Sequence, residues 1–163
     1  MKKTINCFLV TLLFLVGCDD QKKGLAEKFD ALQNQHDSIA SIHEQFKSVH
    51  ANMSQKHKDF KTQLEGMIIQ DSTMLEDIAK HEAILSEHDA LLEGHDKIIE
   101  AHSDLKKGFG EKSAAEMEAQ INEMMEMHDK LTTEHRAMEE EHDMMHKEHK
   151  AITAKLDSIK TLE

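Results

Sequence analysis

The sequence predicts an all-α protein, an elongated antiparallel three-helix bundle or coiled coil, and two observations support this. Charged residues make up 32% of the chain, glycine is scarce, and proline, tryptophan and tyrosine are absent, a composition typical of long helices rather than of a mixed globular fold. Apolar residues and histidines also recur in alternating steps of three and four, the spacing of a and d positions in a heptad repeat. The 163 residues are enough for one modest domain.

The first residues have the pattern of a targeting segment. Lys2 and Lys3 form a short positive region, and the apolar stretch 8–16 that follows is too short to span a bilayer permanently. We therefore expect a signal peptide over residues 1–17.

The end of this segment, Leu15-Val16-Gly17-Cys18, resembles the lipobox of bacterial lipoproteins. The resemblance implies cleavage before Cys18, a diacylglycerol thioether on its sulfur, and an acyl chain such as palmitate on the new N-terminus. Two or more acyl chains anchor a protein stably, so residues 18–24 are expected to form a lipidated tether. An ordinary secretory signal with a chance cysteine is the alternative.

The lipobox resemblance also implies a location in the cell envelope, with the protein held on a membrane through Cys18. The outer membrane is favoured, with the chain on its periplasmic face or at the cell surface, although Asp19 and Asp20 do not by themselves decide between inner and outer membrane. A net charge of −12 argues against a nucleic-acid partner. A protein partner or a homo-oligomer is compatible with the heptad pattern.

Turn signals divide residues 25–163 into three expected helices, at about 25–68, 72–107 and 113–161. At the first break, residues 66–73, a hairpin competes with one continuous helix. We favour the hairpin, because folding back buries the apolar stripe within one chain.

The second break, at 106–112, is the stronger one, because two glycines flank Phe109 there. Ser113 and Glu116 have the spacing of a capping box, which predicts the start of the third helix.

Twelve of the thirteen histidines recur every seven residues, in three blocks of four. The first block is His36, His43, His50 and His57; the second is His81, His88, His95 and His102; the third is His128, His135, His142 and His149.

The positions of the breaks predict how these blocks face one another. A turn near residue 69 places the first two blocks side by side in reverse order, with the pairs His57–His81, His50–His88, His43–His95 and His36–His102. A turn near residues 109–111 would shift the third block by about one heptad and set His128 closer to His95 than to His102. About three layers of three histidines each are then expected.

A structural use of the histidines is the interpretation that the sequence favours. A polar residue at position a can fix the register and number of helices at some cost in stability. Acids placed just before a histidine could accept hydrogen bonds from the ring at the edge of the seam; these are Glu87, Glu134, Glu141 and Glu148. The expected function is then that of a structural or protein-interaction lipoprotein.

Metal binding is the principal alternative, because neutral imidazole is a leading ligand for Zn, Cu and Ni. The sharpest local cluster is His142, His146 and His149, which share one helical face. The other candidate ligands are the heptad histidines His81, His88, His95, His128 and His135. Eleven methionines would suit copper(I), yet methionine at a and d positions is more often core filler.

A pH-responsive bundle is a lesser alternative, since histidine gains charge near pH 6.5. If desolvation dominates, stability is lost as pH falls; if the neighbouring glutamates dominate, it is lost as pH rises. The sequence has neither a nucleophile arrangement nor a phosphate loop, so an enzyme is not expected.

The body of the chain resembles small bacterial lipoproteins with histidine heptads, some of which carry names borrowed from viral A-type inclusion proteins. The matching units are His88-Asp89-Ala90-Leu91, His95-Asp96-Lys97-Ile98 and His128-Asp129-Lys130-Leu131. The resemblance implies an envelope lipoprotein and says nothing about a ligand.

Overall fold

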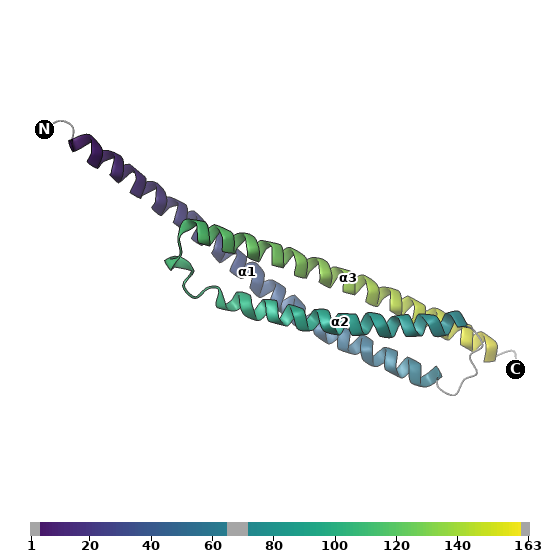
Figure 1. Cartoon of the computed structure of the whole chain (residues 1–163). Helices are drawn as coiled ribbons and strands as arrows, with labels where there is room; N and C mark the ends of the chain where they lie inside the picture. Colours follow the sequence, from purple (N-terminus) through teal and green to yellow (C-terminus); the bar gives the residue numbers. More distant parts are fainter. Residues whose placement is uncertain (1–3, 65–71, 161–163) are drawn as a thin grey trace. The chain divides into compact units, whose positions relative to one another are not determined.

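The computed structural model describes the backbone of residues 4–64 and 72–160, and the side chains of residues 20–64 and 73–158. Its elements are α1 (Thr4–Leu64), α2 (Ser72–Asp104), the short 3-10 helix η1 (Phe109–Glu111) and α3 (Ala114–Lys160) (Figure 1). The described ranges contain no strand, and the predicted all-α bundle of three helices is confirmed. None of their helices has an apolar run that is long enough to cross a membrane.

The boundaries of the helices differ from the predicted ones mainly at the start of the chain. Residues 18–24, expected as a tether, are helical and continuous with the rest of α1. The break predicted at 66–73 falls mostly outside the described residues, but α1 and α2 pack against each other from its two sides. His57 and His81, for example, have ring centroids 5.6 Å apart. The chain therefore folds back here, as the hairpin prediction requires.

Two compact units make up the chain. Unit 1 comprises residues 1–40 and 98–130, and unit 2 comprises residues 41–97 and 131–163. Each unit contains a segment of all three helices. In unit 2 the residues that face one another rise in number along α1 and α3 but fall along α2. The α2 segment of this unit is therefore antiparallel to the other two.

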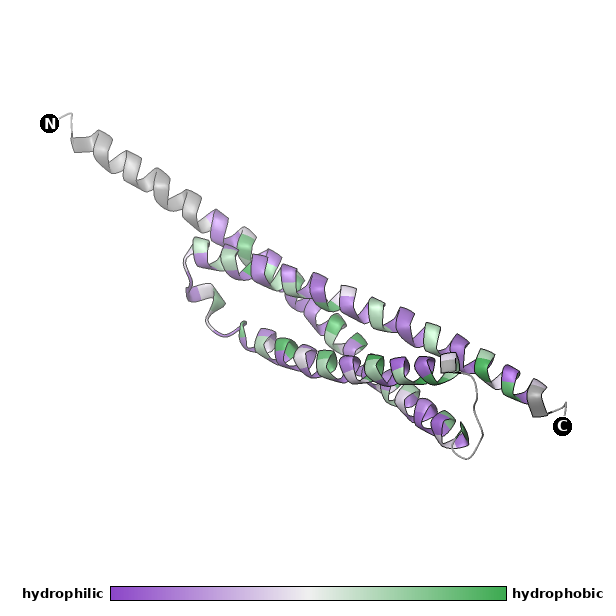
Figure 2. Ribbon diagram, turned by 45° about the vertical axis from the view of Figure 1, so that its right-hand side comes forward, coloured by the Kyte–Doolittle hydropathy of each residue, from purple (hydrophilic) through white to green (hydrophobic). Residues whose placement is uncertain are grey.

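Apolar layers alternate with histidines along the three helices of unit 2, as the a and d pattern predicts. Hydrophobic and hydrophilic residues accordingly interchange at short intervals along each helix (Figure 2). Two of these layers take one buried side chain from each helix: Phe46, Leu92 and Met138 in one, and Met53, Leu85 and Met145 in the next. A third cluster contains Phe60, Leu64, Met74, Ile78 and Ile152.

The core of unit 1 includes the connector between α2 and α3. Phe109 of η1 is 5% exposed and stacks on Phe29 of α1, with ring centroids 3.7 Å apart and planes 11° apart. Gly108, just before it, has a left-handed φ of 77°, a conformation that glycine adopts without strain. The predicted capping box is confirmed, because the Ser113 backbone N–H donates to Glu116 at 2.8 Å and the Glu116 N–H donates back to Ser113 Oγ at 3.3 Å.

The first turns of α3 are covered by Phe109 of the connector rather than by α2. The first turns of α3, with Met117, Ile121 and Met124, pack on α1 residues and on Phe109. Leu105, just after the end of α2, and Phe109 thus complete the core in this part of unit 1.

Replacing Phe109 with alanine tests this role of the connector. A buried phenylalanine truncated to alanine typically costs about 3–5 kcal/mol, and we expect a loss of that order in the free energy of unfolding, measured by urea denaturation with circular dichroism. Met125→Ala in the same unit is the control, because Met125 is 49% exposed and should change stability by no more than about 0.5 kcal/mol. Equal stability of the two variants would contradict the packing.

Candidate metal centre: four histidine triads

The twelve heptad histidines form four triads, and each triad takes one histidine from each helix. In every triad one ring nitrogen from each histidine lies within 4.8 Å of the other two. Unit 1 holds His36, His102 and His128; unit 2 holds His43–His95–His135, His50–His88–His142 and His57–His81–His149.

The predicted pairing of the first two histidine blocks is confirmed by these triads. The predicted shift of the third block is wrong: His128 faces His102, with ring centroids 5.4 Å apart, and not His95. The prediction assumed that α3 turns back directly along α2. Instead the connector packs into the core through Phe109, so four complete triads form rather than about three.

Eleven of the twelve histidines are buried, with between 0% and 6% of their surface exposed. His149 is the exception among the described side chains, because it is only partly buried. Such burial removes imidazole from water, so each ring nitrogen needs a partner inside the protein.

In unit 2 the α3 histidine is the centre of each triad. Its Nε2 atom faces the Nδ1 atoms of the other two rings. For His135 these distances are 2.9 Å to His43 and 3.2 Å to His95. The corresponding distances are 3.1 and 3.2 Å around His142, and 3.0 and 3.2 Å around His149. Three nitrogens therefore converge within hydrogen-bond distance in each triad.

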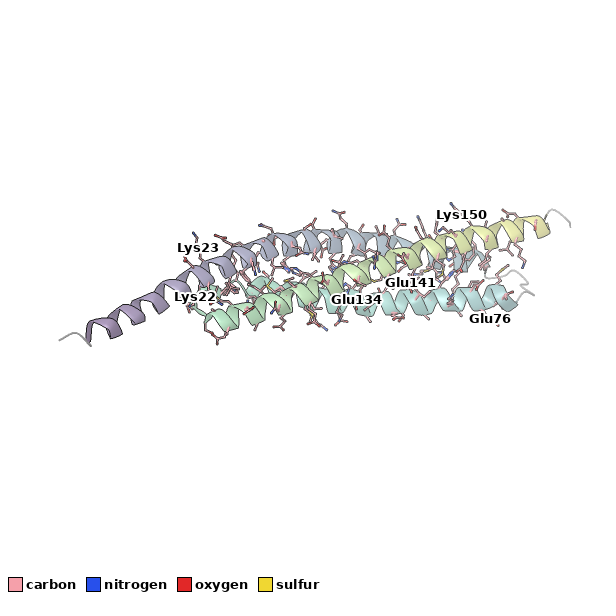
Figure 3. All side chains as sticks on the ribbon, turned by 90° about the horizontal axis from the view of Figure 1, so that it is seen from above. Lys22, Lys23, Glu76, Glu134, Glu141 and Lys150 are labelled. Atoms are coloured by element: carbon pink, nitrogen blue, oxygen red, sulfur yellow. The ribbon has the colours of Figure 1, made fainter. Side chains whose placement is uncertain are left out.

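Carboxylates hold the outward Nε2 atoms of the α1 and α2 histidines. In the first triad of unit 2, His43 Nε2 donates to Asp96 at 3.0 Å and His95 Nε2 donates to Glu134 at 2.8 Å. In the next triad His50 donates to Asp89 at 2.9 Å and His88 donates to Glu141 at 2.6 Å. Glu134 and Glu141 both lie on α3 (Figure 3).

These outer hydrogen bonds determine which nitrogen of each ring carries the proton. An ionised carboxylate only accepts hydrogen bonds, so the proton of each neutral ring sits on Nε2 and the Nδ1 atom keeps a lone pair. In the first triad of unit 2 the lone pairs of His43 and His95 therefore both point at His135 Nε2. One proton or one cation can be shared among the three inner nitrogens.

The triad of His57, His81 and His149 has a less complete outer shell. His81 donates to Glu148, but the buried Nε2 atom of His57 has no hydrogen-bond partner. Glu82 occupies the sequence position that Asp89 and Asp96 have in the other two triads, and it instead forms an ion pair with Lys61.

The triad of unit 1 has looser ring contacts. Its ring centroids are 5.4 to 5.7 Å apart, and the buried Nδ1 atoms of His36 and His102 lack hydrogen-bond partners. The two sequence positions that supply acids to the triads of unit 2 are Ser103 and Met127 here. This triad therefore lacks the corresponding carboxylates.

The local cluster predicted from the sequence is divided by the fold. His142 and His149 belong to different triads, and His146 is exposed and lies outside all four. The remaining candidate ligands, His81, His88, His95, His128 and His135, all belong to triads. Asp89 and Asp96 are the partners that sequence reasoning missed, because they follow an α2 histidine rather than precede it.

Burial lowers the pKa of the central histidine in every triad. The pKa falls to about 4 for His128, His135, His142 and His149, chiefly through desolvation and then through the other two imidazoles of the triad. Desolvation also lowers the pKa values of His36, His43, His57 and His102. At neutral pH these rings are therefore uncharged, and each keeps a lone pair on one ring nitrogen.

The direction of these shifts predicts that acid destabilises the metal-free protein. The unfolded chain gains protons near the ordinary pKa of 6.5, whereas the folded α3 histidines resist protonation until about 4. Stability should therefore be complete above pH 6.5 and fall as pH drops from 6.5 toward 4, by about 1.4 kcal/mol per pH unit for each extra proton that the unfolded chain binds. Thermal melts between pH 4 and 8 measure this. A melting temperature that rises as pH falls through this range would contradict it.

Comparison of the chain with models of protein families, with curated proteins and with solved structures finds no significant match.

Proposed function

We propose that the protein binds divalent transition-metal ions at its histidine triads, with Zn²⁺ as the best fit, and that it does so as a lipid-anchored protein of the cell envelope. The single observation that carries the proposal is the convergence of three imidazole nitrogens, 2.9 to 3.2 Å from the central one, in each triad of unit 2.

The spacing of these nitrogens suits a tetrahedral ion. Metal–nitrogen bonds of about 2.0–2.1 Å require ligand nitrogens about 3.3 Å apart, which is close to the 2.9 to 3.2 Å between the central Nε2 atom and each Nδ1 atom that faces it. The ion would take the place of the proton on the central Nε2 atom, and that proton would move to the Nδ1 atom of the same ring, which stays neutral. Three protein ligands leave the fourth position open to water.

The outer carboxylates support the same assignment. Histidines that bind a metal commonly donate their other N–H to a carboxylate, which orients the ring and raises its basicity. His43 with Asp96 and His95 with Glu134 have this arrangement. Two carboxylates also balance the charge of one divalent ion.

The methionines favour Zn²⁺ over copper(I). Met138 and Met145 are buried in the apolar layers with Phe46, Leu92, Met53 and Leu85. Their thioethers thus contribute to the apolar core, and the candidate ligand sets consist of imidazole nitrogens, which suit Zn²⁺, Ni²⁺ and Cu²⁺.

The envelope location rests on the sequence. The positive residues Lys2 and Lys3, the apolar stretch 8–16 and Cys18 together form the lipoprotein signal. A membrane-anchored protein with several imidazole sites could hold metal ions at the envelope.

A purely structural use of the histidines is the second candidate, and the hydrogen-bonded sequence Asp96–His43–His135–His95–Glu134 favours it. In that case the shared proton, and not a metal ion, joins the three rings. The two candidates differ in what a metal titration shows.

Zn²⁺ binding to the full chain carrying Cys18→Ser, purified metal-free in mild detergent, distinguishes them. We expect more than one Zn²⁺ per chain and a rise in melting temperature, because each site that binds only the folded state stabilises it by about 2.7 kcal/mol at a free metal concentration of 100 Kd. The double variant His135→Ala with His142→Ala should lose two sites. If Zn²⁺ does not change the melting temperature, or if the double variant binds as many Zn²⁺ ions as the parent chain, the structural use of the histidines is the better explanation.

Glu134→Gln tests the outer carboxylates. The amide can still accept from His95, but the negative charge is lost, so we expect the Zn²⁺ affinity of this site to fall roughly 10–100-fold while the number of sites stays the same. Competition titration with a chelator measures the affinity. Glu140→Gln is the control, because Glu140 lies on the same helix, is exposed, and belongs to none of the candidate ligand groups. Equal affinity in the two variants would show that the outer carboxylates do not support the metal.

A further inference from the structure

His146 is the one histidine that the triads leave unused. It is exposed on α3, four residues after His142 and three before His149. It lies outside the heptad positions, so neither helix register nor core packing accounts for an imidazole here.

A groove of about 480 Å³ on unit 2, between α1 and α3, is lined by His146. Further possible metal ligands in its walls are Asp59, Gln63 and Asp157. Lys56 and Lys150 also line the groove and offset the charge of the two aspartates. A cation would therefore bind in this groove through individual ligand atoms, above all the imidazole nitrogens, because the net charge of the lining residues does not attract it.

His149 connects this groove to a triad. Its ring lines the groove, and its Nε2 atom lies 3.0 Å from His57 Nδ1 and 3.2 Å from His81 Nδ1. It is also the triad histidine that is only partly buried. An ion bound at the groove thus needs to pass only one side chain to reach three converging nitrogens.

A second groove of about 570 Å³ on unit 2 is lined by His50, Glu93 and Asp89, among others. The edge of this triad that meets the groove is occupied, because His50 donates to Asp89 at 2.9 Å and is itself only 3% exposed. In the triad that the first groove meets, by contrast, the lining residue His149 is only partly buried. The first groove is therefore the better route to a buried triad.

We propose that the groove beside His146 is the port through which a divalent transition-metal ion enters and leaves the triad of His57, His81 and His149. His146 exchanges with a water ligand of the hydrated ion and passes the ion to His149, which belongs to the triad with His57 and His81. This inference rests on the proposed metal-binding function and adds an exchange site to it.

Stopped-flow loading of Co²⁺, whose visible absorption reports four-coordinate binding, tests the port on the full metal-free chain carrying Cys18→Ser. His146→Ala should lower the rates of loading and of chelator-driven release of one ion roughly tenfold, which corresponds to about 1.4 kcal/mol in the barrier, while the other ions load at the wild-type rate. The final number of bound ions and the Kd should not change, because His146 is not a triad ligand. His146→Asp should retain most of the rate, since a carboxylate oxygen can also capture the ion.

Glu93→Gln, in the second groove, is the matched control and should load at the wild-type rate. Wild-type rates in His146→Ala would overturn the port, as would slow loading in Glu93→Gln alone. Loss of one bound ion in His146→Ala would also overturn it, because His146 would then be a permanent ligand. If the wild-type chain takes up no Co²⁺ and no Zn²⁺, the metal-binding function itself fails; if uptake is normal but independent of His146, only the port fails.

Discussion

The contact between the α3 imidazole and the two imidazoles that face it is the interaction on which the structure depends. Eleven heptad histidines are buried, and each would cost free energy in an apolar core if its nitrogens had no partner. In unit 2 the pairing of Nε2 with two Nδ1 atoms satisfies the inner nitrogens, and carboxylates satisfy most of the outer ones. These polar contacts thereby fix the register of the three helices. The apolar layers between the triads bury the hydrophobic side chains.

The four triads share a plan but differ in their outer shells. Two carboxylates hold the triads centred on His135 and His142, one holds the triad centred on His149, and the unit 1 triad has serine and methionine at the equivalent positions. A divalent ion gains both charge balance and ligand orientation from such carboxylates. The differences therefore imply unequal affinities, with the most complete shells in the triads of His135 and His142.

Much of the fold follows from the heptad spacing, because alternating steps of three and four define which face each helix buries. The pairing of the first two histidine blocks was predictable from the position of the hairpin. The register of α3 was not, because it depends on Phe109, a connector residue outside any repeat that stacks on Phe29. Asp89 and Asp96 were missed for a related reason. Whether the residue before or the residue after a histidine reaches the neighbouring helix depends on helix direction and on the angle at which the helices face one another. The sequence alone does not give that angle.

Anomalous diffraction from crystals of the Zn²⁺-loaded protein tests directly whether the histidine triads bind the metal. We expect zinc peaks at the centres of the unit 2 triads, each with three imidazole nitrogens at about 2.0–2.1 Å. The Nε2 atoms of His43, His50, His88 and His95 should still donate to their carboxylates. Peaks confined to surface carboxylates, with the imidazoles of every triad still hydrogen-bonded to one another, would contradict it.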